Sequence, residues 1–131
     1  MRALILIAVL SAPIIDAAEA GERSYNCDVA NIYHLEETGI LSTATWASQF
    51  IGSSFSVSRS TGKVTGEVLP TRFAKSYRVI NHGSAENSFK AVAEFAGQFQ
   101  LLEIQEFRED VKKPFIASSM GGAGIVTGTC E

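Results

Sequence analysis

Residues 54–65, SFSVSRSTGKVT, carry the clearest local pattern of the chain, and this pattern indicates the fold class. Phe55 and Val57 alternate with serines, which places their apolar side chains on one face of an extended strand. Residues 59–62 have the composition of a turn, and residues 63–65 resume the alternation. The segment is therefore predicted to be a β-hairpin.

Short strands with the same alternation are predicted on both sides of this hairpin. Tyr25, Cys27 and Val29 alternate with polar residues near the start of the chain. Residues 76–80 form a further strand, which ends in the turn 81–84. More strands are predicted at 99–107, 115–117 and 125–130, separated by the charged loop 108–113 and the glycine-rich turn 121–124.

Two segments fit more than one structure. Apolar residues between 85 and 99 fit one face of a helix, but Phe89, Ala91, Ala93 and Phe95 also alternate at strand period. We predict a strand, because Gly97-Gln98 lies before the next strand at a spacing that suits a hairpin. Residues 39–52, which include Trp46, fit either a strand or one short helix.

Cys27 and Cys130 are the only cysteines, and we predict that they form a disulfide. An even cysteine count in an exported chain favours a bridge over free thiols, and neither residue belongs to a CxxC motif or has a neighbouring histidine that would suggest a metal site. About seven or eight strands in sequence form an antiparallel meander, and a bridge between the first and last strands brings its edges together. The predicted fold is thus an all-β small barrel, with a two-sheet β-sandwich as the alternative.

Residues 1–20 have the pattern of a cleavable signal peptide. Met1-Arg2 precedes an apolar run at residues 3–10, and Ala18-Glu19-Ala20 offers a cleavage site after Ala20. The run is too short to span a bilayer, which needs about 20 apolar residues. We expect residues 21–131 to form one periplasmic or secreted domain without a membrane span; a buried N-terminal helix or an uncleaved anchor is the alternative.

Composition and motifs argue against several kinds of chemistry. Basic residues are scattered and the net charge is −3, so nucleic acid is not an expected partner. Two histidines with both cysteines oxidised leave too few ligands for a metal site. No serine lies in a GxSxG elbow, and residues 121–124 match no phosphate-loop motif. We predict no catalytic residues, no metal and no cofactor.

Several short motifs resemble those of small exported bacterial proteins without an assigned activity. The motifs lie at residues 52–55, 59–62, 87–90, 113–115 and 127–130. They are turn and strand signatures, so the resemblance implies a fold and a compartment. In architecture the chain is also similar to periplasmic lysozyme inhibitors, which are small disulfide-linked β-barrels, although no segment here matches their inhibitory loop.

The expected function is binding, through loops at one end of the barrel, of a protein or an envelope component. The candidate binding residues are Arg59, Lys63, His82, Trp46 and the pair Lys112-Lys113, each of which is also explained as solvated surface, or for Trp46 as core. A carrier of a small apolar ligand is the alternative. A filled interior in which Phe89, Phe95, Leu101 and Phe115 meet would argue against that carrier. An enzyme of unrecognised type is the third hypothesis.

Overall fold

The computed structural model describes residues 24–69, 74–120 and 124–131. The predicted signal peptide and most of the glycine-rich turn 121–124 lie outside these ranges. Within them the chain forms one antiparallel sheet and one 3-10 helix. In chain order the elements are β1 (Ser24–Leu35), β2 (Leu41–Thr43), η2 (Thr45–Phe50), β3 (Ser54–Ser58), β4 (Val64–Thr65), β5 (Ser76–His82), β6 (Phe89–Phe95), β7 (Gln98–Ile104), β8 (Lys113–Met120) and β9 (Gly124–Cys130).

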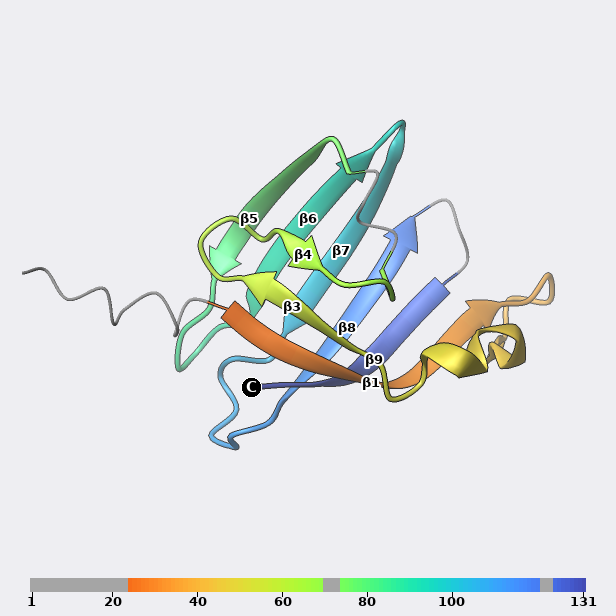
Figure 1. Ribbon diagram of the computed structural model, residues 1–131, viewed down its shortest axis with the longest axis horizontal. Helices are drawn as coiled ribbons and strands as arrows, with labels where there is room; N and C mark the ends of the chain where they lie inside the picture. Colours follow the sequence, from red (N-terminus) through yellow and green to blue (C-terminus); the bar gives the residue numbers. More distant parts are fainter. Residues whose placement is uncertain (1–23, 70–73, 121–123) are drawn as a thin grey trace, which may run out of the picture.

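The sheet is a meander whose two ends in sequence are neighbours in space. Its strand order is β4-β3-β1-β9-β8-β7-β6-β5, and β2 pairs with the end of β1. The sheet curls into a half-barrel, with the β3–β4 hairpin folded back toward β5 and β6 (Figure 1). The predicted all-β, barrel-like antiparallel fold is confirmed. Its outermost strands are β4 and β5, between which the described residues form no strand pairing.

The predicted disulfide is present and lies at the junction of the first and last strands. Cys27 on β1 is the register partner of Cys130 on β9, and the two are bonded. The β1–β9 pairing shifts by one residue at Ala30, a bulge beside Gly128. A Cβ atom on Gly128 would lie 1.9 Å from the Asp28 carbonyl oxygen, so only glycine allows this close approach of the two backbones.

The inner face of the sheet carries the core. Tyr25, Cys27 and Val29 on β1 are buried, as their alternation predicts, and Phe55 packs edge-on against Phe115 with ring centroids 5.2 Å apart. The strand prediction for residues 85–99 is confirmed for β6, whose inward side includes the buried Phe89.

Leu101 and Trp46, for which a place in the core was one of the possibilities, lie on the surface. Leu101 is 38 % exposed, because its neighbours Gln100 and Leu102 both point inward and strand side chains alternate. The buried side chains in this part of β7 are therefore those of Gln100 and Leu102, which are 4 % and 3 % exposed. Trp46 is 68 % exposed on η2, where Ala47 is the buried residue, so its interpretation as core is wrong.

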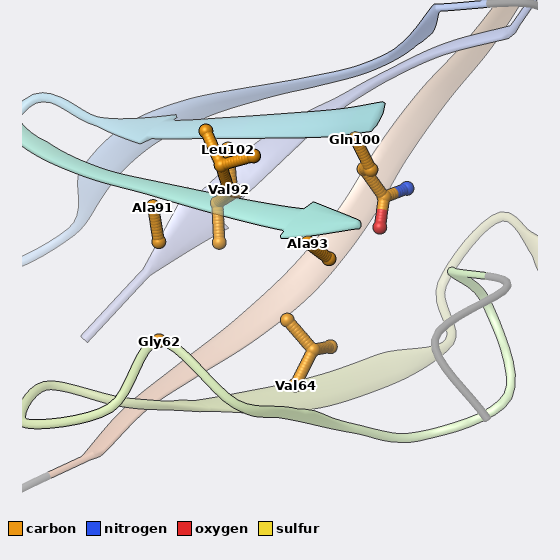
Figure 2. Close-up of a pocket in the computed structure, with 7 residues that line it drawn as sticks. All are labelled: Gly62, Val64, Ala91, Val92, Ala93, Gln100 and Leu102. Carbon is orange, nitrogen blue, oxygen red and sulfur yellow. The ribbon is translucent and has the colours of Figure 1, made fainter. Parts of the chain in front are cut away.

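The described residues enclose one small cavity between the β3–β4 hairpin and strands β6 and β7. It has a volume of about 10 Å³ and is lined by Gly62, Val64, Ala91, Val92, Ala93, Gln100 and Leu102 (Figure 2). This volume holds about one water molecule. In the part of the chain that the structure describes, no helix is long and apolar enough to cross a membrane.

Candidate functional site

Three connections meet at one end of the half-barrel and form an open cleft of about 420 Å³. They are the turn after β3, the turn after β5 and the loop between β7 and β8. Ten residues line the cleft: Arg59, His82, Gly83, Ser84, Ala85, Glu106, Phe107, Arg108, Glu109 and Lys113. Because these connections follow paired strands, the sheet fixes the position of the residues that flank the cleft.

The turn after β3 presents Arg59 through local hydrogen bonds. The Gly62 N–H donates to the Ser58 carbonyl oxygen at 2.8 Å, and the Thr61 N–H donates to Ser58 Oγ at 3.3 Å. Gly62 has φ +74°, a conformation that glycine adopts without strain. These hydrogen bonds close the turn, and Arg59, its first residue, lies beside the cleft.

A contact between two turns joins Arg59 to His82. His82 Nδ1 lies 3.1 Å from the Arg59 carbonyl oxygen. Since a carbonyl oxygen only accepts, Nδ1 carries the proton in this hydrogen bond. The two candidate residues, which are 23 positions apart in the sequence, therefore lie side by side.

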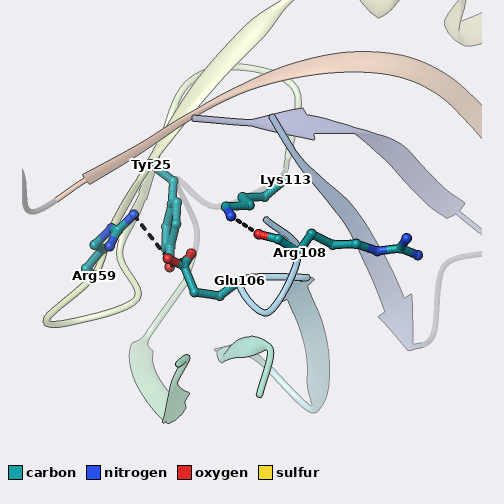
Figure 3. Close-up of polar contacts among 5 residues, drawn as sticks. All are labelled: Tyr25, Arg59, Glu106, Arg108 and Lys113. Atoms are coloured by element: carbon teal, nitrogen blue, oxygen red, sulfur yellow. Dashed lines mark hydrogen bonds and ion pairs between the residues drawn. The ribbon is translucent and has the colours of Figure 1, made fainter. Parts of the chain in front are cut away.

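Tyr25, Arg59 and Glu106 form a polar network beneath the cleft (Figure 3). The Tyr25 hydroxyl donates to Glu106 Oε2 at 2.7 Å. Arg59 Nη2 lies 3.8 Å from Glu106 Oε1, and the guanidinium carbon lies 4.0 Å from the centroid of the Tyr25 ring. The Tyr25 ring packs in turn on Phe89, at 5.1 Å between centroids, so the network is attached to the core.

The environment of Tyr25 keeps its hydroxyl protonated. Burial raises the pKa of the Tyr25 phenol well above its usual range, and the hydrogen bond to Glu106 raises it further. The positive charge of Arg59 acts in the opposite direction but is the smaller effect. The phenol is therefore a permanent donor to Glu106 at neutral pH.

The loop between β7 and β8 has its own hydrogen bonds. Arg108 Nε donates to Gln105 Oε1 at 2.9 Å, and Lys113 Nζ donates to the Arg108 carbonyl oxygen. Figure 3 shows Lys113 pointing into the region between this loop and Tyr25, while the Arg108 side chain extends away from Arg59. Lys113 thus holds the loop and also lines the cleft.

The structure brings together some of the predicted site residues and separates others. Arg59, His82 and Lys113 line the cleft, whereas Lys63 and Lys112 are exposed outside its lining. Trp46 lies on η2, which follows β2 and packs near β1. Glu106 is a further candidate that no sequence pattern singles out. Its partner Tyr25 is 81 positions away, and no local pattern indicates that pairing.

No group of three or more metal-ligating side chains occurs among residues 24–69, 74–120 and 124–131. No protein-family model, curated protein or solved structure matches this chain significantly. We therefore interpret the cleft from its own geometry.

Proposed function

We propose that this chain is an exported, non-enzymatic binding protein of the bacterial envelope, and that its ligand or partner binds in the cleft beside Arg59 and His82. The convergence of three connections on one open cleft carries the proposal. Binding sites commonly lie on loops that a rigid scaffold holds in place. Here the scaffold includes the disulfide-linked strands β1 and β9 and the buried Tyr25.

Two observations support export to the periplasm or the medium. Residues 1–20 have the charge, length and cleavage pattern of a signal peptide. The disulfide between Cys27 and Cys130 is compatible with an oxidising compartment. Mass spectrometry of the exported protein without reductant tests both points: we expect a chain that starts at Gly21 and contains no free thiol.

The apolar-carrier alternative is less well supported. A drug-sized ligand needs a cavity of about 300 Å³ or more, whereas the cavity that the described residues line between the hairpin and strands β6 and β7 is about 10 Å³. Of the four residues whose meeting in the interior would argue against a carrier, Phe89 and Phe115 are buried, Phe95 is half-buried and Leu101 points outward.

The enzyme alternative also lacks support from the hydrogen bonds. His82, Ser84 and Glu106 line the same cleft. A nucleophilic serine needs a hydrogen bond to its base, and the base needs one to an acid. His82 Nδ1 instead contacts the Arg59 carbonyl oxygen, and Ser84 Oγ accepts the N–H groups of Glu86 and Asn87.

A retention experiment tests the binding function. Immobilised mature protein is exposed to envelope extract, with a cleft variant, His82→Ala with Lys113→Glu, run in parallel. A second variant, Trp46→Ala with Lys63→Glu, changes residues outside the cleft. We expect one component to be retained by the unmodified protein and by the second variant but lost with the first. Equal retention by the cleft variant would contradict the proposal.

A further inference from the structure

We propose that the cleft binds an oxyanion, a carboxylate or phosphate group of its ligand, and that Arg59 is the residue that receives it. This inference rests on the binding function proposed for the cleft and names the chemistry of its ligand. Three features of the site carry it: the balance of charge, the fixed orientation of Arg59, and the donors on the facing walls.

The lining of the cleft has one more cation than it has acids, whereas the protein is acidic overall. Its lining contains the cations Arg59, Arg108 and Lys113 and the acids Glu106 and Glu109, whereas the whole chain has a net charge of −3. Glu106 is already engaged by the Tyr25 hydroxyl and faces Arg59. An anion that enters the cleft is therefore attracted locally although the protein as a whole repels it.

The guanidinium of Arg59 is held in place with few of its donors used. Its guanidinium carbon lies 4.0 Å from the centroid of the Tyr25 ring, and this contact restricts the movement of the group. Its 3.8 Å approach to Glu106 is longer than a hydrogen bond, which is typically 2.7–3.2 Å. Arg59 Nε is buried and has no hydrogen-bond partner among the described residues.

A guanidinium of this kind is suited to an oxyanion. Its parallel N–H groups match the spacing of two oxygens on a carboxylate or phosphate. A side chain whose orientation is already fixed loses little conformational freedom when the ligand binds. The Arg59 side chain is 41 % exposed, so part of the group is accessible from the cleft.

The facing walls offer further donors. Lys113 Nζ has three protons, one of which is used by the Arg108 carbonyl oxygen. Ser84 Oγ accepts hydrogen bonds from the N–H groups of Glu86 and Asn87, which leaves its own proton able to donate to a ligand. Hydrogen-bond donors therefore lie on more than one wall of the cleft.

An NMR titration of the mature, oxidised protein tests this inference. The probes are pyrophosphate and citrate as soluble anions, spermidine as a cation and N-acetylglucosamine as a neutral solute, all at constant ionic strength. We expect saturable amide shifts at residues 59, 82–85 and 106–113 with the anions alone. Vesicles of phosphatidylglycerol, compared with phosphatidylcholine, distinguish a lipid headgroup from a soluble anion as the source.

Variants then assign the interaction to Arg59. Arg59→Lys keeps the charge but removes the parallel donors, and we expect it to weaken anion binding by at least about tenfold, as the loss of a charge-assisted hydrogen bond does. Lys63→Ala, outside the cleft, is expected to bind as the unmodified protein does. Thermal unfolding of each variant checks that the fold is retained.

Three other outcomes would contradict the inference, each in a different part. Unchanged anion affinity in Arg59→Lys would remove Arg59 from the site. Cleft shifts with spermidine or N-acetylglucosamine but not with the anions would overturn the oxyanion chemistry and leave the binding function standing. If no probe shifts the cleft residues, the oxyanion inference is wrong, while the retention experiment still decides the binding function separately.

Discussion

Cys27 and Cys130 lie directly opposite each other on neighbouring antiparallel strands, so their disulfide crosslinks two residues that the sheet already pairs. The bond spans 103 positions of the sequence. Its effect on the folded ladder is therefore small, and its main effect is on the unfolded chain, whose freedom it restricts.

Removing this disulfide lowers stability without changing the fold. For a loop of this length the chain-entropy model gives about 4–5 kcal/mol. We expect urea unfolding of the Cys27→Ser, Cys130→Ser double variant to show a loss of about 2–5 kcal/mol with native-like circular dichroism. Reductant is expected to destabilise the unmodified protein and leave the double variant unaffected. Identical unfolding midpoints for the two proteins would contradict this account.

Tyr25→Phe isolates the hydrogen bond to Glu106 from the packing of the ring. The substitution keeps the ring contacts with Phe89 and Arg59 but leaves the partly buried Glu106 carboxylate without its 2.7 Å donor. A hydrogen bond to a charged group contributes about 1.5–3 kcal/mol, so a loss of that size is expected in chemical denaturation. Tyr33→Phe is the matched control, since no described residue hydrogen-bonds to the Tyr33 hydroxyl; we expect its unfolding to be nearly unchanged.

Alkaline pH destabilises the protein through the same tyrosine. Because the pKa of Tyr25 is raised in the folded state, the folded state keeps this proton at pH values where the unfolded chain, with a tyrosine pKa of about 10, has lost it. The stabilisation is complete below about pH 10 and decreases as pH rises above that value. We expect a decline in unfolding free energy above pH 10 that is smaller in Tyr25→Phe. Tyrosinate absorbance at 295 nm should show one late-ionising group that the variant lacks.

Gly62→Ala tests how closely the β3–β4 hairpin packs on the sheet. A Cβ atom at Gly62 would lie 2.9 Å from Ala91 Cβ, whereas one at Gly39 would meet nothing within 4 Å. Both glycines have positive φ, at +74° and +81°, so backbone strain is matched between them. We expect Gly62→Ala to be about 1–3 kcal/mol less stable than Gly39→Ala in urea unfolding. Equal stabilities would mean that the hairpin does not press on β6.

Trp46 is the only tryptophan, so fluorescence reports its environment directly. At 68 % exposure, its emission should resemble that of free tryptophan and be quenched readily by iodide. Trp46→Ala is expected to change stability by less than about 0.5 kcal/mol, as surface substitutions usually do. Blue-shifted, protected emission would instead place this residue in a core.

The strands could be predicted because alternation is a local property. Tyr25, Cys27 and Val29, or Phe55 and Val57, show their shared face within a few residues. The helix η2 spans only six residues, too few for a helical period to distinguish Trp46 from Ala47 as the buried side chain. The side of β7 that faces inward is hidden for a different reason: Leu101 and Leu102 are both apolar, so the sequence alone does not indicate which of them is buried.

The sequence indicates only some of the residues that form the cleft. Arg59 and His82 are recognisable one at a time, since Arg59 follows β3 directly and His82 is the last residue of β5. Their proximity depends on how the sheet curls, and this is set by pairings across most of the chain. The same holds for Tyr25 and Glu106, which lie 81 positions apart and meet only when the first strand and the loop after β7 are both in place.

The position of β9 determines when this domain can fold. These seven residues lie between β1 and β8 although Cys130 follows Cys27 by 103 positions, so without β9 the sheet is divided into two separate pieces. A growing chain therefore cannot complete this sheet before β9 is available, and contacts of such long range form slowly. For a protein that we propose is exported, this order suits folding after translocation, in an environment that oxidises Cys27 and Cys130.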